Sequence, residues 1–230
     1  MLKLPIRAVL FDCDGTLIDN IPLHRRINLQ LTSEMDFPEK TAYFSRHPTL
    51  AMLKMGIKKD KIMEFWKKFT EAELQAGPKI FRGVNELLQK LRAQGIFTAI
   101  ITNRHLQVGF LELLSQSGIY LSYFDFLITY QNRILNEEIH HRPMNLLTTY
   151  YGKPNRKVLA PIIDRLKLVP GFPRSVLLVG DSVHLDYKLA RRMNFQFIGV
   201  ESGSETREGF LKVIHKRLLI KNVGELIKMM

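Results

Sequence analysis

Short, continuous apolar runs alternate with amphipathic stretches along most of the chain. The runs are Ala8–Phe11, Phe97–Ile101, Phe124–Ile128, Val176–Val179 and Phe195–Val200. Hydrophobicity that is continuous rather than alternating indicates strands buried on both faces, which is typical of parallel sheets. Between the runs, apolar residues recur at helical spacing, as in the stretch 84–91 that precedes Gly95. The pattern predicts an α/β fold built on an open parallel sheet.

Residues 21–77 do not follow this rhythm, because their apolar positions have helical spacing throughout. Ile62, Phe65, Trp66 and Phe69 form one stripe, and prolines divide the stretch into several short helices. This helical block follows the first predicted strand, so it is an insertion into the sheet domain. We predict a small all-helical cap at 21–77 and an α/β core formed by 1–20 and 78–230.

Composition and charge narrow the class of protein. The 230 residues are 46% hydrophobic and 24% charged, and no apolar run is long enough to cross a bilayer. The N-terminus lacks the features of a secretory signal, and Cys13 is the single cysteine, so we expect a cytoplasmic protein without disulfides. Cys13 lies between two acids, so its side chain is expected to face the core.

The net charge of +12 attracts anions at long range. The basic residues are scattered and accompany no nucleic-acid-binding module, so we expect a small phosphorylated metabolite as partner, and neither a nucleic acid nor a membrane. The sequence does not establish the oligomeric state.

Two acids follow the first predicted strand. Asp12 and Asp14 are two positions apart on an extended backbone, and Gly15 then allows a sharp turn. Like charges this close repel unless one is protonated or a cation lies between them. The pair therefore favours a divalent cation with oxygen ligands at the carboxyl end of a parallel strand.

Further polar residues stand at later strand ends or junctions, and each alone is most often a turn residue. They are Thr102 with Asn103, Lys153 before Pro154, and Asp181 with Asp186. Carboxyl ends of parallel strands lie on one rim of a sheet, so these side chains should meet Asp12 and Asp14.

This ordered set resembles the haloacid dehalogenase superfamily along essentially the whole chain, most specifically at 12–16 and 180–182. The resemblance is to its phosphatase type, similar to phosphoglycolate phosphatases and β-phosphoglucomutases, with a Rossmann-like core and a helical cap after the first motif. It implies a phosphatase in which Asp12 attacks phosphorus and forms an aspartyl-phosphate. Asp14 would protonate the leaving group and then activate water, so a raised pKa is expected for Asp14 near the other acids.

The resemblance also implies how the phosphoryl group and the metal are held. Thr102, the backbone amide of Asn103 and Lys153 would bind the transferring group, with Lys157 a weaker candidate for the lysine. The cofactor would be Mg²⁺.

The implied magnesium ligands are the carboxylate of Asp12, the main-chain carbonyl of Asp14 and the carboxylate of Asp181. Asp186 would orient this shell and pair with the lysine. In the cap, His24 and Arg46 are candidate substrate contacts, together with Arg25 and Arg26.

Two other functions stay open on the sequence alone. A sugar phosphomutase of the β-phosphoglucomutase type shares the paired acids and the cap, and His24 falls where such mutases carry a cap-hinge histidine. A non-enzymatic binding protein on a retired scaffold is disfavoured, because all the expected polar positions are filled. The role of the segment 130–151 stays open, and the sequence does not identify the substrate.

Overall fold

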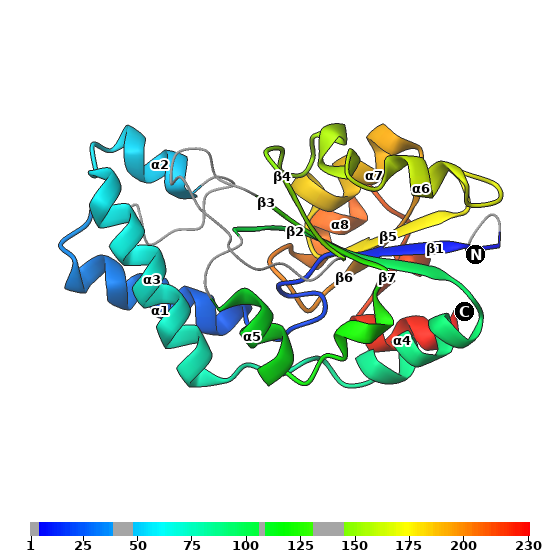
Figure 1. Cartoon of the computed structure of the whole chain (residues 1–230), viewed down its shortest axis with the longest axis horizontal. Coiled ribbons are helices and arrows are strands. Elements are labelled where there is room, and N and C mark those ends of the chain that lie inside the picture. Colours follow the sequence, from blue (N-terminus) through cyan, green and yellow to red (C-terminus); the bar gives the residue numbers. More distant parts are fainter. Residues whose placement is uncertain (1–4, 39–47, 106–108, 131–144) are drawn as a thin grey trace.

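The computed structural model describes residues 5–38, 48–105, 109–130 and 145–230. Within these residues, seven parallel strands form one sheet in the order β4-β3-β2-β1-β5-β6-β7 (Figure 1). The strands are β1 (Ala8–Phe11), β2 (Phe97–His105), β3 (Phe126–Tyr130), β4 (Leu146–Thr149), β5 (Val176–Gly180), β6 (Gln196–Val200) and β7 (Leu219–Ile220). The predicted α/β fold with an open parallel sheet is confirmed.

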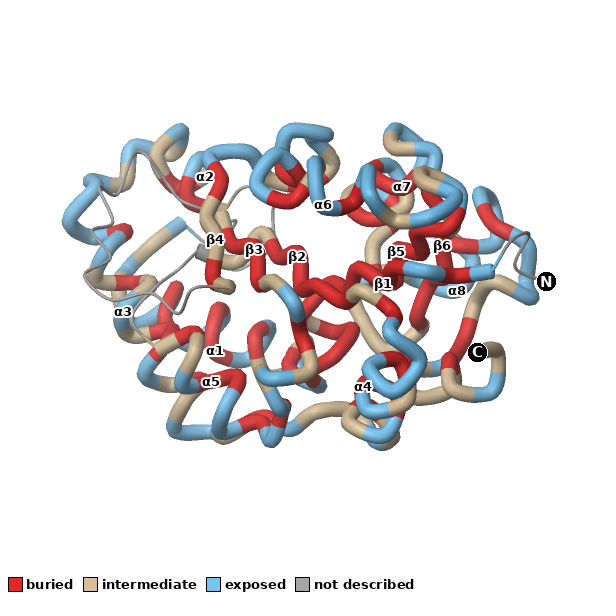
Figure 2. The backbone as a smooth tube through the Cα atoms, turned by 45° about the vertical axis from the view of Figure 1, so that its right-hand side comes forward, coloured by how far each residue is buried: buried red, intermediate tan, exposed pale blue. Residues whose placement is uncertain are grey.

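Helices cover both faces of the sheet. On one face lie α4 (Val84–Ala93), α5 (Phe110–Gln116) and a C-terminal 3₁₀ helix (Val223–Lys228); on the other lie α6 (Ile163–Lys167), α7 (Lys188–Met193) and α8 (Arg207–Leu211). Buried residues run along the strands between these two layers (Figure 2). This is the arrangement that continuous apolar strands require, because each strand needs cover on both sides.

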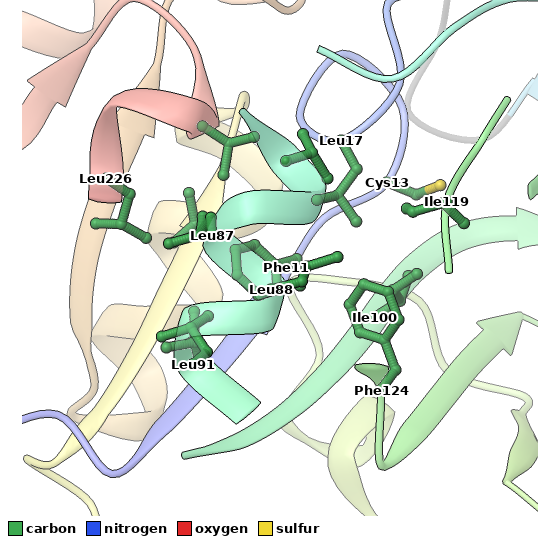
Figure 3. Packing of buried hydrophobic residues seen from close by; sticks show 14 of the residues in the cluster. Phe11, Cys13, Leu17, Leu87, Leu88, Leu91, Ile100, Ile119, Phe124 and Leu226 are labelled. Atoms are coloured by element: carbon green, nitrogen blue, oxygen red, sulfur yellow. The ribbon is translucent and has the colours of Figure 1, made fainter. Parts of the chain in front are cut away.

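The central strand β1 divides its side chains between the two layers. Val9 and Phe11 pack in the cluster that contains Leu87, Leu88 and neighbouring residues of α4, whereas Ala8 and Leu10 pack in the cluster on the opposite face (Figure 3 shows the first). All four β1 residues are fully buried. Cys13 is also fully buried, in the Phe11 cluster, as the sequence predicts.

Among the described residues, three helices follow β1 before the chain returns to the sheet. They are α1 (Ile21–Glu34), α2 (Pro48–Lys54) and α3 (Lys59–Ala76), and they lie at one end of the sheet (Figure 1). They share an apolar cluster of their own, formed by Ile27, Leu31, Met52, Ile62, Phe65 and Phe69. The apolar stripe of α3 thus packs inside this helical group, and α3 ends at Gly77 in the left-handed region.

The sequence patterns did not predict two of the strands. β4 lies within the segment 130–151, whose remaining residues 131–144 fall outside the described chain, and β7 has only two residues. Both are edge strands, so they lack the long two-sided apolar run that marks the inner strands. No helix in the described part of the chain is long and apolar enough to span a membrane.

Candidate active site

The strand order predicts a crevice at the carboxyl end of the sheet. From β1 the chain adds β2, β3 and β4 on one side, and β5, β6 and β7 on the other. The strand order therefore reverses at β1, and ligands bind beside such a switch point in open α/β sheets. Asp12 follows β1, Thr102 lies on β2, and Asp181 follows β5, so the three predicted residues come from adjacent strands.

Lys153 connects two of the predicted acids. Its ammonium group donates to the carboxylate of Asp12 and to Oδ1 of Asp186, the latter at 2.6 Å, and its side chain is only 2% exposed. Burial lowers the pKa of Lys153, but the two carboxylates outweigh burial and hold its pKa above the usual value. Lys157 instead lies over the ring of Tyr151 at 5.0 Å, so Lys153 is the lysine at this site.

Three buried carboxylates crowd together around this lysine. Asp12, Asp181 and Asp186 each offer an oxygen, and these oxygens lie within 4.8 Å of one another. Burial, followed by the charge of Asp186, raises the pKa of Asp181 to about 6. Burial also raises the pKa of Asp12, although Lys153 opposes the rise. One ammonium group does not balance three carboxylates, so the cluster suits an additional cation with a preference for oxygen ligands.

Glycines leave the space that Asp181 occupies. A Cβ on Gly203 would lie 2.1 Å from both Cβ and Oδ2 of Asp181, and one on Gly15 would lie 2.9 Å from Oδ2. Gly15 has a φ of +72°, which glycine adopts without strain. The backbone amide of Ser204 donates to Oδ2 of Asp181 at 2.6 Å. The carboxylate is therefore held by a backbone donor in a pocket that larger residues would fill.

Asn103 secures the loop that carries the lysine. The Asn103 side chain accepts from the backbone amide of Lys153 at 2.7 Å and donates to its carbonyl at 3.2 Å. Thr102 is buried, and its hydroxyl oxygen accepts from the amide of Arg104. The sequence predicts a phosphate contact from the Asn103 backbone; its side chain has the separate task of fixing Lys153.

Asp14 belongs to a second cluster, centred on Arg104 of β2. Arg104 donates to Asp14 through Nε at 3.2 Å and Nη2 at 2.6 Å, and to Glu73 of α3 through Nη1 at 2.6 Å and Nη2 at 2.8 Å. Nε2 of His24 lies 2.5 Å from Oε1 of Glu73. Asn20 donates to both Asp14 and Glu73. The second cluster therefore joins residues of α1 and α3 to the sheet.

The expected raised pKa of Asp14 is wrong for this structure. Burial does raise it, but the guanidinium of Arg104 outweighs burial and lowers the pKa of Asp14 below the usual value. The expectation considered only the neighbouring acids. In the structure each member of the acidic pair has its own cationic partner, Lys153 for Asp12 and Arg104 for Asp14.

The candidate cap contacts lie in different surroundings. His24 is buried beside Glu73 and Arg104, close to Asp14. Arg25 and Arg26 are exposed on α1, and Arg46 lies outside the described residues. The sequence patterns did not identify Arg104 or Glu73; the one available signal was the position of Arg104 directly after Thr102 and Asn103.

Comparison with known proteins agrees with this geometry. A family model described as haloacid dehalogenase-like hydrolase matches residues 9–200. A protein of Caldanaerobacter subterraneus subsp. tengcongensis named as a pyrophosphatase, PpaX, is 27% identical over 206 residues, covering 85% of this chain and 82% of the relative. A phosphoglycolate phosphatase of Nitrosococcus oceani is 25% identical over 243 residues, covering 97% of this chain and 98% of the relative.

Solved structures share the fold of this chain. One described as a β-phosphoglucomutase from Thermotoga maritima has a TM-score of 0.65 and 18% identity, and the match covers 97% of this chain and 98% of that one. This likeness shows a shared fold. The family model spans the chain from β1 to β6 and includes both acidic clusters. The chain therefore belongs to the haloacid dehalogenase-like hydrolases.

Proposed function

We propose that this chain is a magnesium-dependent phosphatase that hydrolyses a small phosphomonoester through an aspartyl-phosphate on Asp12. The observation that carries the proposal is the bridge from Lys153 to Asp12 and Asp186 beside Asp181. It provides a carboxylate nucleophile, a fixed positive charge and oxygen ligands within one buried crevice. Phosphoryl transfer depends mainly on alignment and on neutralising the phosphoryl oxygens, which these groups supply.

The donor set at this crevice fits magnesium. The carboxylates of Asp12 and Asp181, with the main-chain carbonyl of Asp14, would hold the ion, while Asp186 would orient Lys153. All of these donors are oxygens, which hard divalent cations prefer. The ion when bound supplies neutralising charge to the phosphoryl oxygens.

In the first proposed step, a carboxylate oxygen of Asp12 bonds to phosphorus and the bond to the leaving oxygen breaks. Asp14 gives its proton to that oxygen, while Thr102, the Asn103 amide and Lys153 hold the phosphoryl group. Arg104 keeps Asp14 ionised in the present structure, so this step requires their contact to loosen.

In the second step, water bonds to phosphorus and gives a proton to ionised Asp14. The bond between Asp12 and phosphorus then breaks, and orthophosphate leaves. We assign the helices of 21–77 as the cap, which would exclude competing water and contact the leaving group through His24. The free, buried Cys13 is in keeping with a cytoplasmic reaction.

The test is phosphate release from a panel of metabolite phosphomonoesters with Mg²⁺, comparing the parent with Asp12→Asn. Asp19→Asn is the matched control, because Asp19 is an exposed acid near the same motif. We expect Mg²⁺-dependent release that falls at least about a thousandfold in Asp12→Asn, because the nucleophile is lost. Asp19→Asn should stay within about twofold of the parent, since surface substitutions have small effects.

Other outcomes would overturn the proposal. Isomerisation of a sugar phosphate without net phosphate release, primed by a bisphosphate, would assign the chain as a phosphomutase. Salt-sensitive binding to DNA or RNA with no Mg²⁺-dependent turnover would assign it as a binding protein.

A further inference from the structure

The guanidinium of Arg104 bonds mainly to the two carboxylates of the second cluster. Each of its three nitrogens donates to a carboxylate: Nε to Asp14, Nη1 to Glu73, and Nη2 to both. The Glu73 side chain is 1% exposed and the Arg104 side chain 14%, so solvent competes little for these bonds. Four of the five N–H groups of the guanidinium thus donate to carboxylates, so an anion that approached Arg104 would compete with Asp14 and Glu73 for it.

The charges of this cluster do not add up to a binding site for an anion. It has two carboxylates, of Asp14 and Glu73, and one guanidinium. Its formal charge is −1 with a neutral His24 and zero with a protonated one. The chain as a whole carries +12, so the overall field attracts phosphorylated molecules while this local cluster offers them no net positive charge.

The second cluster lies where the leaving group of a substrate would bind in the proposed phosphatase. In the proposed phosphatase, Asp14 faces the oxygen of the leaving group, and this inference rests on that function. The residues that touch Asp14 among the described ones include Arg104 and Asn20, with Glu73 immediately behind them. A leaving group at Asp14 therefore meets carboxylate and amide groups and a guanidinium that two carboxylates already neutralise, and hydroxyls suit all of these as hydrogen-bonding partners.

A second negative charge on the leaving group would have a different effect. It would either lie against Asp14 and Glu73 or take Arg104 from them, leaving Glu73 buried without its guanidinium. A buried charge that loses its partner is strongly destabilising. Specificity follows from the penalty on the wrong partner as much as from contacts to the right one.

We propose that Glu73 and Arg104 make this enzyme selective for phosphomonoesters whose leaving group is neutral and bears hydroxyls. Leaving groups with a carboxylate or phosphate next to the ester are disfavoured. The substrate class would then differ from those in the names of the phosphoglycolate phosphatase and pyrophosphatase relatives.

The test uses two matched pairs of substrates that differ only by replacement of a carboxylate with a hydroxymethyl group. They are 2-hydroxyethyl phosphate against phosphoglycolate, and glycerol 3-phosphate against 3-phosphoglycerate. We expect kcat/KM to favour the neutral member of each pair by at least about tenfold, as expected for like charges several ångströms apart near a protein surface. This ratio of kcat/KM values is measured on the parent protein, so the first part of the test does not depend on the folding of any variant.

Glu73→Gln keeps the side-chain shape and removes one negative charge, so it should reduce that preference at least about fivefold. Glu71→Gln is the control: Glu71 lies on the same helix with a side chain 62% exposed, and its ratio should equal that of the parent. Thermal unfolding of each variant checks that it is folded.

The outcomes separate this inference from the proposed function. p-Nitrophenyl phosphate, whose nitrophenyl group carries no carboxylate and no second phosphate, reports phosphatase activity independently of the two substrate pairs. No Mg²⁺-dependent hydrolysis of any ester would end the proposed function itself. Hydrolysis with equal or greater kcat/KM for the carboxylate members would overturn the selectivity alone, and so would a folded Glu73→Gln variant with the parental ratio.

Discussion

Replacing Lys153 by methionine removes the positive charge at the first cluster and nearly preserves the length of the side chain. The Lys153 side chain is 2% exposed, and its ammonium group pairs with Asp12 and Asp186, with the carboxylate of Asp181 close to both acids. Removing one member of a buried ion pair leaves uncompensated charge, which costs about 3–5 kcal/mol. We expect the free energy of unfolding of Lys153→Met to fall by that amount at neutral pH.

The assay is urea denaturation in the presence of EDTA, with Lys157→Met as the matched control. Lys157 is an exposed lysine four residues away, over the ring of Tyr151 at 5.0 Å. A cation–π contact at an exposed site contributes about 0.5–1 kcal/mol, so the control should lose no more than that. The difference between the free energies of unfolding of the two variants then measures the effect of the buried ion pairs of Lys153, separate from the effect of losing a nearby lysine.

The pH dependence provides a second criterion. Burial already raises the pKa values of Asp12 and Asp181 in the parent, that of Asp181 to about 6, and loss of the positive charge of Lys153 raises both further. At mildly acidic pH the folded variant then binds protons that the unfolded chain releases, so stability rises as pH falls. The deficit of Lys153→Met should therefore shrink as the pH falls from about 7.5 to about 5.5. A deficit under about 1 kcal/mol at neutral pH, or one that does not change with pH, would refute the reasoning.

Three further predictions concern the carboxylate cluster of Asp12, Asp181 and Asp186 and the helical group of α1–α3. The apparent affinity for Mg²⁺ should weaken by up to about tenfold per pH unit below about pH 6, because binding must displace the proton of Asp181. Calorimetric titrations that give the same affinity from about pH 5 to about pH 7.5 would contradict this. Gly203→Ala would place a Cβ 2.1 Å from Oδ2 of Asp181, so it should lower the free energy of unfolding by about 1–3 kcal/mol and the Mg²⁺ affinity by at least about tenfold. A variant that binds Mg²⁺ like the parent would argue against a ligand role for Asp181. Phe65→Ala should lose about 3–5 kcal/mol, because Phe65 is fully buried in the cluster of α1–α3; a denaturation midpoint equal to the parental one would show that this cluster contributes little.

The inner part of the sheet was predictable because its physical signal is local. Ala8–Phe11 and Val176–Val179 are apolar without interruption, and both are buried on two faces at the centre of the sheet. Lys153 was also distinguishable from Lys157, through the proline that follows it. The edge strands β4 and β7 are short and have one neighbour each, so their sequences carry no comparable signal.

The second cluster was not predictable for a different reason. Arg104 contacts Asp14, which lies after β1, and Glu73, which lies on α3. Nothing in the residues around position 104 specifies these partners. The positive charge of Arg104 lowers the pKa of Asp14, whereas the sequence led us to expect a raised pKa. The wrong pKa expectation therefore arose because Arg104 was not identified. Pairings between distant segments are what pattern and propensity do not encode.

The central position of β1 has a consequence for how the chain folds during synthesis. Ala8 pairs with Phe97 on one side and with Val176 on the other, so the first strand made waits for β5 before its second edge is covered. Pairings between such distant segments form slowly, and an uncovered apolar strand edge is a template for association with other chains. A nascent chain that has reached only β4 can form one side of the sheet but not the crevice, since Asp181 and Asp186 are still to be made. The risk of aggregation is therefore greatest before residues 176–180 leave the ribosome, and catalytic competence arises only after that point.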